Sequence, residues 1–195
     1  TTSVIRTPPP SASRLCPTPL LFVSAKAWDP DSHTGLDVLT ATLSMKGFTC
    51  ILSDLALPAP LPRDSAELMH HFVADLKGQL RHTVAFPPVI FARASASLVA
   101  QTYIGSNPAT AMMLMGAIPP TNSDVPKALL PTPLEEFNFE PKFPIALLAT
   151  ALQMERLRRT NRLAQDPMVD LVTTEDLESQ DALLKIEGWL DDLGI

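Results

Sequence analysis

Short runs of apolar residues recur along the chain, and segments with helical spacing separate them. An unbroken apolar run between turn residues is typical of a strand that is buried on both faces of a sheet. Regular alternation of such strands with helices predicts an α/β fold, with a doubly wound, mostly parallel sheet of about six strands and helices on both faces. We expect the strands within residues 17–25, 48–53, 89–92, 109–120, 145–150 and 168–174.

The helices between these strands have their own signals. Asp64 and Glu67 form a capping-box pattern at the start of one helix, and Gly47 is a natural stop for the helix before it. In the last helix, apolar residues recur at spacings of three and four. We expect helices within residues 35–47, 64–80, 97–103, 152–164 and 183–193.

The length of 195 residues and a hydrophobic content of 46% suit one compact domain. We place this domain at residues 17–195, after a disordered or extended leader over residues 1–16. No acid precedes Asp29, and this region is rich in Ser, Thr and Pro, with Arg6 and Arg14 among its few charges. That composition favours an intracellular, reducing location, with the mitochondrial matrix first and the cytoplasm as the alternative.

The overall charge and the apolar pattern exclude several classes of function. A formal net charge of -6 argues against a nucleic-acid partner, and no apolar run approaches the roughly 20 residues that span a bilayer. Cys16 and Cys50 lie in no metal-binding or disulfide pattern. Asp29, Asp31 and His33 alternate in one loop, but no further ligand converges on them. We therefore expect no metal and no cofactor.

The order of these segments resembles the α/β-hydrolase superfamily over nearly the whole chain. "PPVIFARASASLVAQTY" resembles its nucleophile elbow, "FPIALLATA" the strand before its catalytic acid, and "VDLVTTEDLESQDALLKIEGWLDDL" its last strand, histidine loop and final helix. The resemblance implies a member that is truncated at the N-terminus. It also implies a member without a cap domain, because only the Pro-rich crossover of residues 118–144 stands in the cap's place.

The tight turn of a nucleophile elbow needs small residues two positions before and after the nucleophile. Ala92 and Ala96 satisfy this requirement and place Ala94 at the nucleophile position. A shift to Ser95 puts Arg93 in the tight turn, and a shift to Ser97 does the same with Val99. Alanine cannot attack a carbonyl, so the expected elbow has no nucleophile.

The other positions that the resemblance implies also lack catalytic groups. Ser24 and Ala25 stand where the oxyanion loop often begins with His-Gly, and residues 174–177 contain no histidine. Residues 151–153 follow the fifth expected strand, where the family has its acid, and Glu155 is the nearest carboxylate. A shifted triad of Ser95 with His33 stays open, because triads are defined by geometry.

These observations predict a catalytically inactive protein that serves as a binding or structural subunit of a larger assembly. The alternatives are a serine esterase or thioesterase that uses Ser95 or Ser97, and a small-molecule receptor with a vestigial pocket beside Ala94 and Ser24. For a protein partner, we expect two groups of contact residues, since apolar groups in an irregular segment either cover strand ends or bind another protein. These groups are Leu134, Phe137 and Phe139 in the crossover, and Arg156, Arg158, Arg159 and Arg162 near the basic helix.

Overall fold

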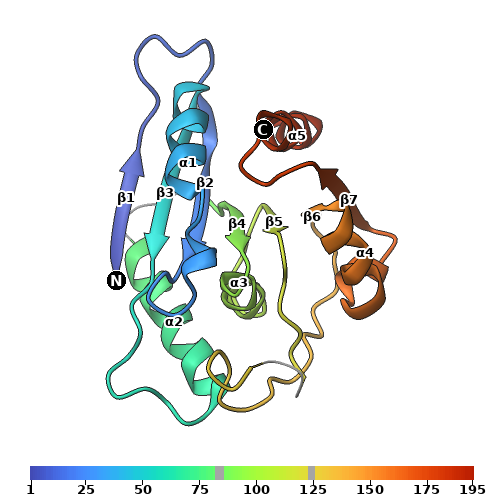
Figure 1. The fold of residues 1–195 in the computed structure, drawn as a ribbon. Helices are drawn as coiled ribbons and strands as arrows, with labels where there is room; N and C mark the ends of the chain where they lie inside the picture. The colour runs from blue at the N-terminus through green and yellow to red at the C-terminus, as the bar shows by residue number, and fades with distance from the viewer. Residues whose placement is uncertain (82–85, 123–125) are drawn as a thin grey trace.

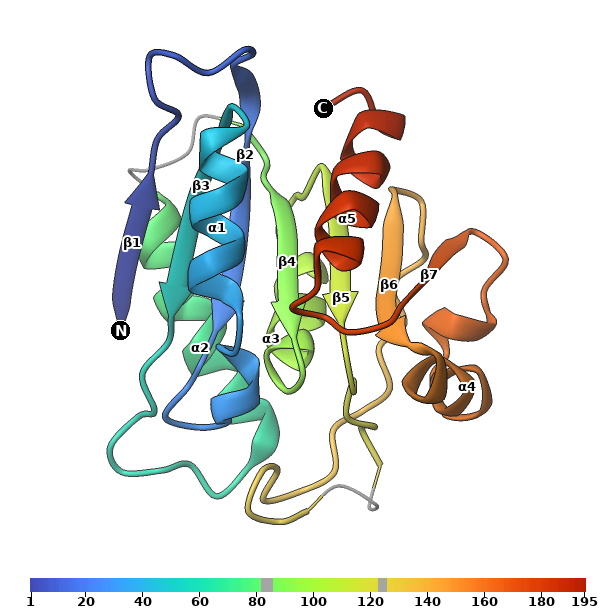
Figure 2. The same cartoon turned by 45° about the horizontal axis from the view of Figure 1, so that its top comes forward.

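A computed structural model of the chain describes residues 1–81, 86–122 and 126–195. Seven strands form one sheet in the order β1-β3-β2-β4-β5-β6-β7 (Figures 1 and 2). Strands β2 to β7 are parallel, and β1 runs antiparallel to β3. The predicted fold class is confirmed. The strands are β1 (Thr2–Arg6), β2 (Cys16–Ser24), β3 (Phe48–Asp54), β4 (Val89–Arg93), β5 (Ala111–Met115), β6 (Ile145–Thr150) and β7 (Val169–Thr174).

Four of the five α-helices in the described residues join successive parallel strands, and α5 follows β7. Local sequence signals fix several of the helix ends. The carboxylate of Asp64 accepts hydrogen bonds from two first-turn amides of α2, as the N-cap pattern predicts. Thr150 and Gln153 form a capping box at the start of α4. Helix α4 ends earlier than expected because Asn161 is extended, and a short 3-10 turn follows it. The helices are α1 (Leu36–Met45), α2 (Ser65–Leu80), α3 (Ala96–Ile104), α4 (Ala151–Thr160) and α5 (Gln180–Asp192).

The helices cover the two faces of the sheet unequally. Helices α2, α3 and α4 pack on one face, and α1 and α5 pack on the other (Figure 1). Successive residues of the central strands point to opposite faces, so both layers are apolar. In β4, for example, Ile90 belongs to the first layer and Phe91 to the second, where its ring stacks on Phe22 at 4.7 Å.

The N-terminal segment contributes a strand that the sequence pattern does not reveal. We expected a disordered or extended leader over residues 1–16, but residues 2–6 form β1 at the edge of the sheet. Val4 and Ile5 remain about half exposed, so β1 has no buried face that would produce an apolar alternation. Pairing with β3 holds this strand, and a single-strand pattern cannot show such pairing.

The Pro-rich crossover between β5 and β6 folds back over the domain. Leu134, Phe137 and Phe139 are half-buried and pack against the core layer that α2, α3 and α4 cover. The indole N–H of Trp28 donates to the carbonyl of Leu129 at 2.9 Å, which ties the crossover to the loop after β2. Residues 123–125 of this segment lie outside the described residues. In the structure these apolar side chains cover part of the core, and their use in binding a partner stays a prediction.

Within the described residues, no helix is both long enough and apolar enough to cross a bilayer.

Candidate functional site

The turn between β4 and α3 has an unusual backbone. Ala94 has a φ of 49°, and among the described residues it is the only one besides glycine in this left-handed region. Alanine adopts such a φ at a cost, because its Cβ crowds the backbone. The Ala94 amide donates to the carbonyl of Met115 at 3.1 Å, and Ala92 and Ala96 are fully buried on either side. The chain thus has a sharp, strained strand-to-helix turn with a methyl group at its apex.

The two serines that follow the apex are buried within α3 and its cap. Ser95 is 2% exposed and Ser97 is 0% exposed. Among the described residues, no hydrogen bond joins either hydroxyl to a histidine, and the Ser97 hydroxyl has no hydrogen-bond partner. In the part of the chain that the structure describes, neither serine has the adjacent base that activates a nucleophile.

The backbone amides at this turn are bound by side chains of the protein itself. The Ser95 N–H donates to Asp29 Oδ2 at 3.0 Å, and Asp29 Oδ1 accepts from the Asp31 amide at 3.1 Å. The Ala25 N–H donates to the hydroxyl of Ser32 at 3.0 Å. An oxyanion hole of this type uses the amide after the nucleophile together with an amide from a neighbouring strand-end loop. Here the two corresponding amides, those of Ser95 and Ala25, already donate to Asp29 and Ser32.

The sequence leaves open a triad of His33 with Ser95, but the structure places His33 beside Ser24. Its Nδ1 lies 3.0 Å from the Ser24 hydroxyl, and its Nε2 lies 3.1 Å from Asp37 Oδ2. The order of carboxylate, imidazole and hydroxyl is that of a catalytic triad. However, Ser24 is 0% exposed, and its hydroxyl also donates to Asp54 Oδ1 at 3.0 Å. This geometry links the ends of β2 and β3 through partly buried hydrogen bonds.

Asp54 is the anionic centre of that network. Burial raises its pKa, but hydrogen bonds from the Lys26 amide, the Lys26 ammonium group and the Ser24 hydroxyl outweigh burial and bring the pKa below its ordinary value. The carboxylate is therefore ionised at neutral pH. Ser24 and Asp54 are register partners at the ends of two parallel strands, so the two strand ends in the sequence could have predicted this contact.

The positions expected for a catalytic acid and base hold structural groups. The Thr150 hydroxyl caps α4, and Glu155 is exposed and pairs with Arg159 on the same helix. After β7, the hydroxyl of Thr174 donates to Asp181 at 2.9 Å, and Glu175 is exposed to solvent. No side chain in this loop can accept a proton as a histidine would.

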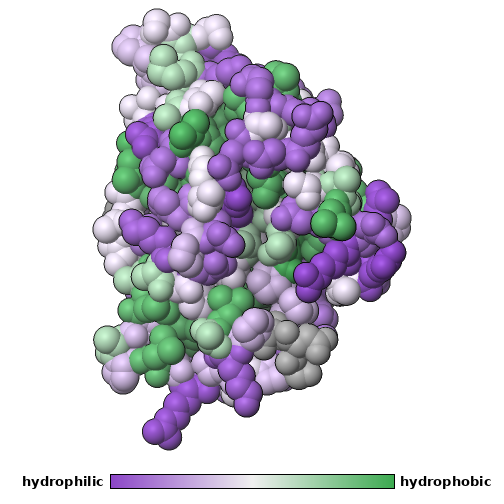
Figure 3. All heavy atoms as spheres, viewed as in Figure 1, coloured by the Kyte–Doolittle hydropathy of each residue, from purple (hydrophilic) through white to green (hydrophobic). Residues whose placement is uncertain are grey.

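The arginines that we expected at a partner surface fall into two groups. Arg156, Arg158 and Arg159 are exposed on α4, where hydrophilic residues dominate the surface at the right of Figure 3. Arg162 instead lies over the ring of Phe139, 4.8 Å from its centre, and donates to the Phe139 carbonyl at 3.1 Å. Arg162 therefore fastens the crossover to the domain.

The described part of the chain contains no group of three or more His, Cys, Asp and Glu side chains that could hold a metal ion. The three loop residues with alternating spacing diverge instead. Asp29 binds amides, His33 binds Ser24 and Asp37, and Asp31 is exposed.

Comparison with known proteins identifies the architecture. No protein-family model matches the chain, and no curated protein matches it. An alpha/beta hydrolase from Sphaerobacter thermophilus DSM 20745 has a similar structure, with a TM-score of 0.59 and 14% identity over 99% of this chain and 96% of that one. Alpha/beta hydrolase domain-containing protein 10 from mouse has a TM-score of 0.55 and 10% identity, over 98% and 92% of the two chains. At these identities the likeness shows the fold alone, and the fold of this chain is that of the α/β hydrolases.

Proposed function

We propose that this protein is a non-catalytic member of the α/β-hydrolase fold that acts by binding, as a subunit of a larger assembly. One observation carries the proposal: the strained elbow has a methyl group at its apex, and the amide beside it is bound to Asp29. A substrate carbonyl at this position would meet no nucleophile. It would also have to displace a carboxylate from the amide that should stabilise its negative charge.

The surroundings of the elbow support the same proposal. The loop between β7 and α5 offers the carboxylates Glu175 and Asp176 but no imidazole. Ser95 and Ser97, the alternatives for an esterase or thioesterase, are buried and have no base within hydrogen-bonding distance among the described residues. Removing the members of a catalytic triad costs several orders of magnitude in rate.

A hydrolase that uses Ser24 is the second candidate, and the hydrogen-bonded series of Asp37, His33 and Ser24 favours it. The burial of Ser24 weighs against this candidate, because a nucleophile must reach its substrate. The nearest backbone donors are also engaged, since the Ala25 amide binds Ser32 and the Lys26 amide binds Asp54. We therefore assign the series a role in joining β2, β3 and α1.

Ester turnover tests the catalytic part of the proposal. The purified protein is expected to hydrolyse short-chain aryl esters no faster than buffer does, and Ala94→Ser is expected to add nothing, because a serine without a base stays a weak nucleophile. The melting temperature of Ala94→Ser serves as the folding control. A burst of product from Ala94→Ser would reveal a hidden base and contradict the proposal. Turnover by the parent protein that Ser24→Ala abolishes would establish the second candidate.

Size exclusion of a native extract tests the binding part. The protein is expected to elute well ahead of the purified 21.1 kDa chain, and we assign the contact to the exposed arginines Arg156, Arg158 and Arg159 of α4. Replacing these three with glutamine should move the protein to the position of the free chain. The same change at the exposed Arg63 and Arg81 is the control for lost charge. Elution of the native protein at the free position would contradict a subunit role.

A further inference from the structure

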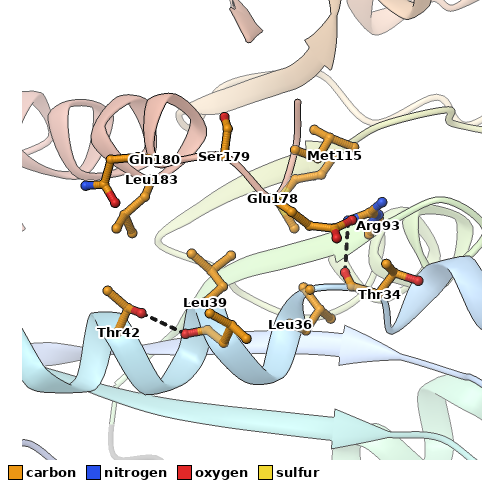
Figure 4. A pocket seen from close by; sticks show the side chains of 13 residues that line it. Thr34, Leu36, Leu39, Thr42, Arg93, Met115, Glu178, Ser179, Gln180 and Leu183 are labelled. Atoms are coloured by element: carbon orange, nitrogen blue, oxygen red, sulfur yellow. Dashed lines mark hydrogen bonds and ion pairs between the residues drawn. The ribbon is translucent and has the colours of Figure 1, made fainter. Parts of the chain in front are cut away.

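A groove separates α1 from α5 on the sheet face that these two helices cover (Figure 4). It has a volume of about 230 Å³ and lies over the carboxyl ends of β4 and β5. Neither Ala94 nor Ser24 lines it, but Arg93, the residue before Ala94, does, so the groove adjoins the elbow. Its volume is below that of pockets for drug-sized ligands, which points to a smaller molecule.

Much of the wall of the groove is apolar, although Thr42 and Gln180 also line it. Leu39 on α1 and Leu183 on α5 extend into it from opposite sides (Figure 4), and the buried side chains of Leu36 and Met115 close its base. Val38, at the rim, is 73% exposed. An apolar group that enters between the two helices would remove these side chains from water, which favours binding in proportion to the area covered.

One end of the groove is polar and contains a guanidinium group with unused donors. Arg93 Nη1 donates to the Thr34 carbonyl at 2.9 Å and to Glu178 Oε1 at 3.0 Å. Among the described residues, no hydrogen bond or ion pair uses Arg93 Nε or Nη2. The edge formed by these two nitrogens matches the two oxygens of a carboxylate. The side chain of Arg93 is 16% exposed, so its charge is only partly screened by solvent.

Two glycines hold the loop that forms this end. Gly35 and Gly116 have φ values of 77° and 78°. A Cβ at Gly35 would lie 2.7 Å from Glu178 Cγ, and a Cβ at Gly116 would lie 2.9 Å from Leu177 Cδ1. The absence of side chains at both positions lets residues 177–178 sit close to the sheet, with Glu178 beside Arg93.

We propose that this groove binds a small amphipathic carboxylate, whose apolar chain lies between α1 and α5 and whose carboxylate meets the free edge of Arg93. Glu178 is 46% exposed, and such a pair contributes little to stability, so the guanidinium can serve both carboxylates. The carboxylates of Glu178 and of the ligand still repel each other, so Glu178 lowers the affinity of the groove for the ligand. The proposal is independent of whether the elbow is catalytic.

Titration of the 195-residue chain with octanoate tests the proposal, with affinity measured by calorimetry and the site located by NMR of labelled methyl groups. The signals of Met115, Leu177 and Leu183 are expected to shift. Arg93→Gln should weaken binding about tenfold or more, because a charge-assisted hydrogen bond is lost. Arg63→Gln removes an equal charge from an exposed position before α2 and should leave the affinity unchanged.

Glu178→Gln should have the opposite effect to Arg93→Gln. It should tighten octanoate binding about threefold, because it removes the negative charge that repels the octanoate carboxylate. Val38→Glu adds a charge at an exposed rim position, so it tests the site without endangering the fold, and it should weaken binding. Octanamide should bind at least about tenfold less tightly than octanoate. Equal affinity for octanamide, equal losses in Arg93→Gln and Arg63→Gln, or shifts confined to other methyl groups would overturn the proposal.

Discussion

Replacing Asp29 with alanine is expected to lower the free energy of unfolding by about 2 to 3 kcal/mol. The carboxylate of Asp29 accepts from the amide of Ser95, which is 2% exposed, and from the amide of Asp31. Alanine would leave the Ser95 amide buried without an acceptor, and it would remove the cap of the short 3-10 turn at residues 30–32. Urea unfolding at neutral pH measures the change.

Two matched variants separate the hydrogen bonds of Asp29 from a general effect on the loop. Asp29→Asn keeps one oxygen acceptor and should lose only about 1 kcal/mol. Asp31→Ala changes an exposed neighbour and should stay within about 0.5 kcal/mol of the parent protein. A loss of less than about 0.5 kcal/mol in Asp29→Ala would show that the Ser95 amide does not depend on the Asp29 carboxylate. It would contradict our assignment of Asp29 as the acceptor that occupies this amide.

The second large effect is expected at Gly47, between α1 and β3. Gly47 has a φ of 102°, and a Cβ at this position would lie 2.1 Å from the carbonyl oxygen of Arg14. Neither the backbone conformation nor the neighbouring backbone can accommodate a side chain, so Gly47→Ala should cost about 3 kcal/mol or more. Thermal and urea unfolding both report this loss.

Gly78→Ala is the control for that substitution, and the opposite sign is expected. Gly78 lies inside α2, and among the described residues no heavy atom apart from its chain neighbours and the nearby helix backbone lies within 4 Å of where its Cβ would be. Alanine there should stabilise the protein by about 0.5 to 1 kcal/mol, because glycine lowers helix stability. A mild effect of Gly47→Ala would show that residues 14–16 do not approach the turn as closely as the structure has them.

Much of the fold could be predicted because local chemistry and tertiary packing agree. Strand β6 coincides with the apolar run of residues 145–150, and Asp64 caps α2 as its spacing from Glu67 indicated. The tight turn lies at Ala94, the residue that the spacing of Ala92 and Ala96 singled out. In each case the residues that determine the structure are neighbours in the sequence.

The remaining features depend on contacts between distant segments. Strand β1 has no buried face, and only its pairing with β3 orders it. The alternation of Asp29 with His33 could not show where each side chain points, because the loop turns through a 3-10 helix and sends them to different partners. The sequence of the crossover is compatible with two roles for Phe137 and Phe139, which are packing on the protein's own core and contact with a partner. No local pattern distinguishes these two roles.

Intact mass spectrometry after incubation with a fluorophosphonate tests the central claim most directly. The reagent modifies serines that a neighbouring base has activated, whatever their position in the sequence. We expect the protein to keep its unmodified mass under conditions that label a serine esterase to completion. Addition of one reagent group per chain, lost in Ser24→Ala or in Ser95→Ala, would show an active nucleophile and contradict a non-catalytic role.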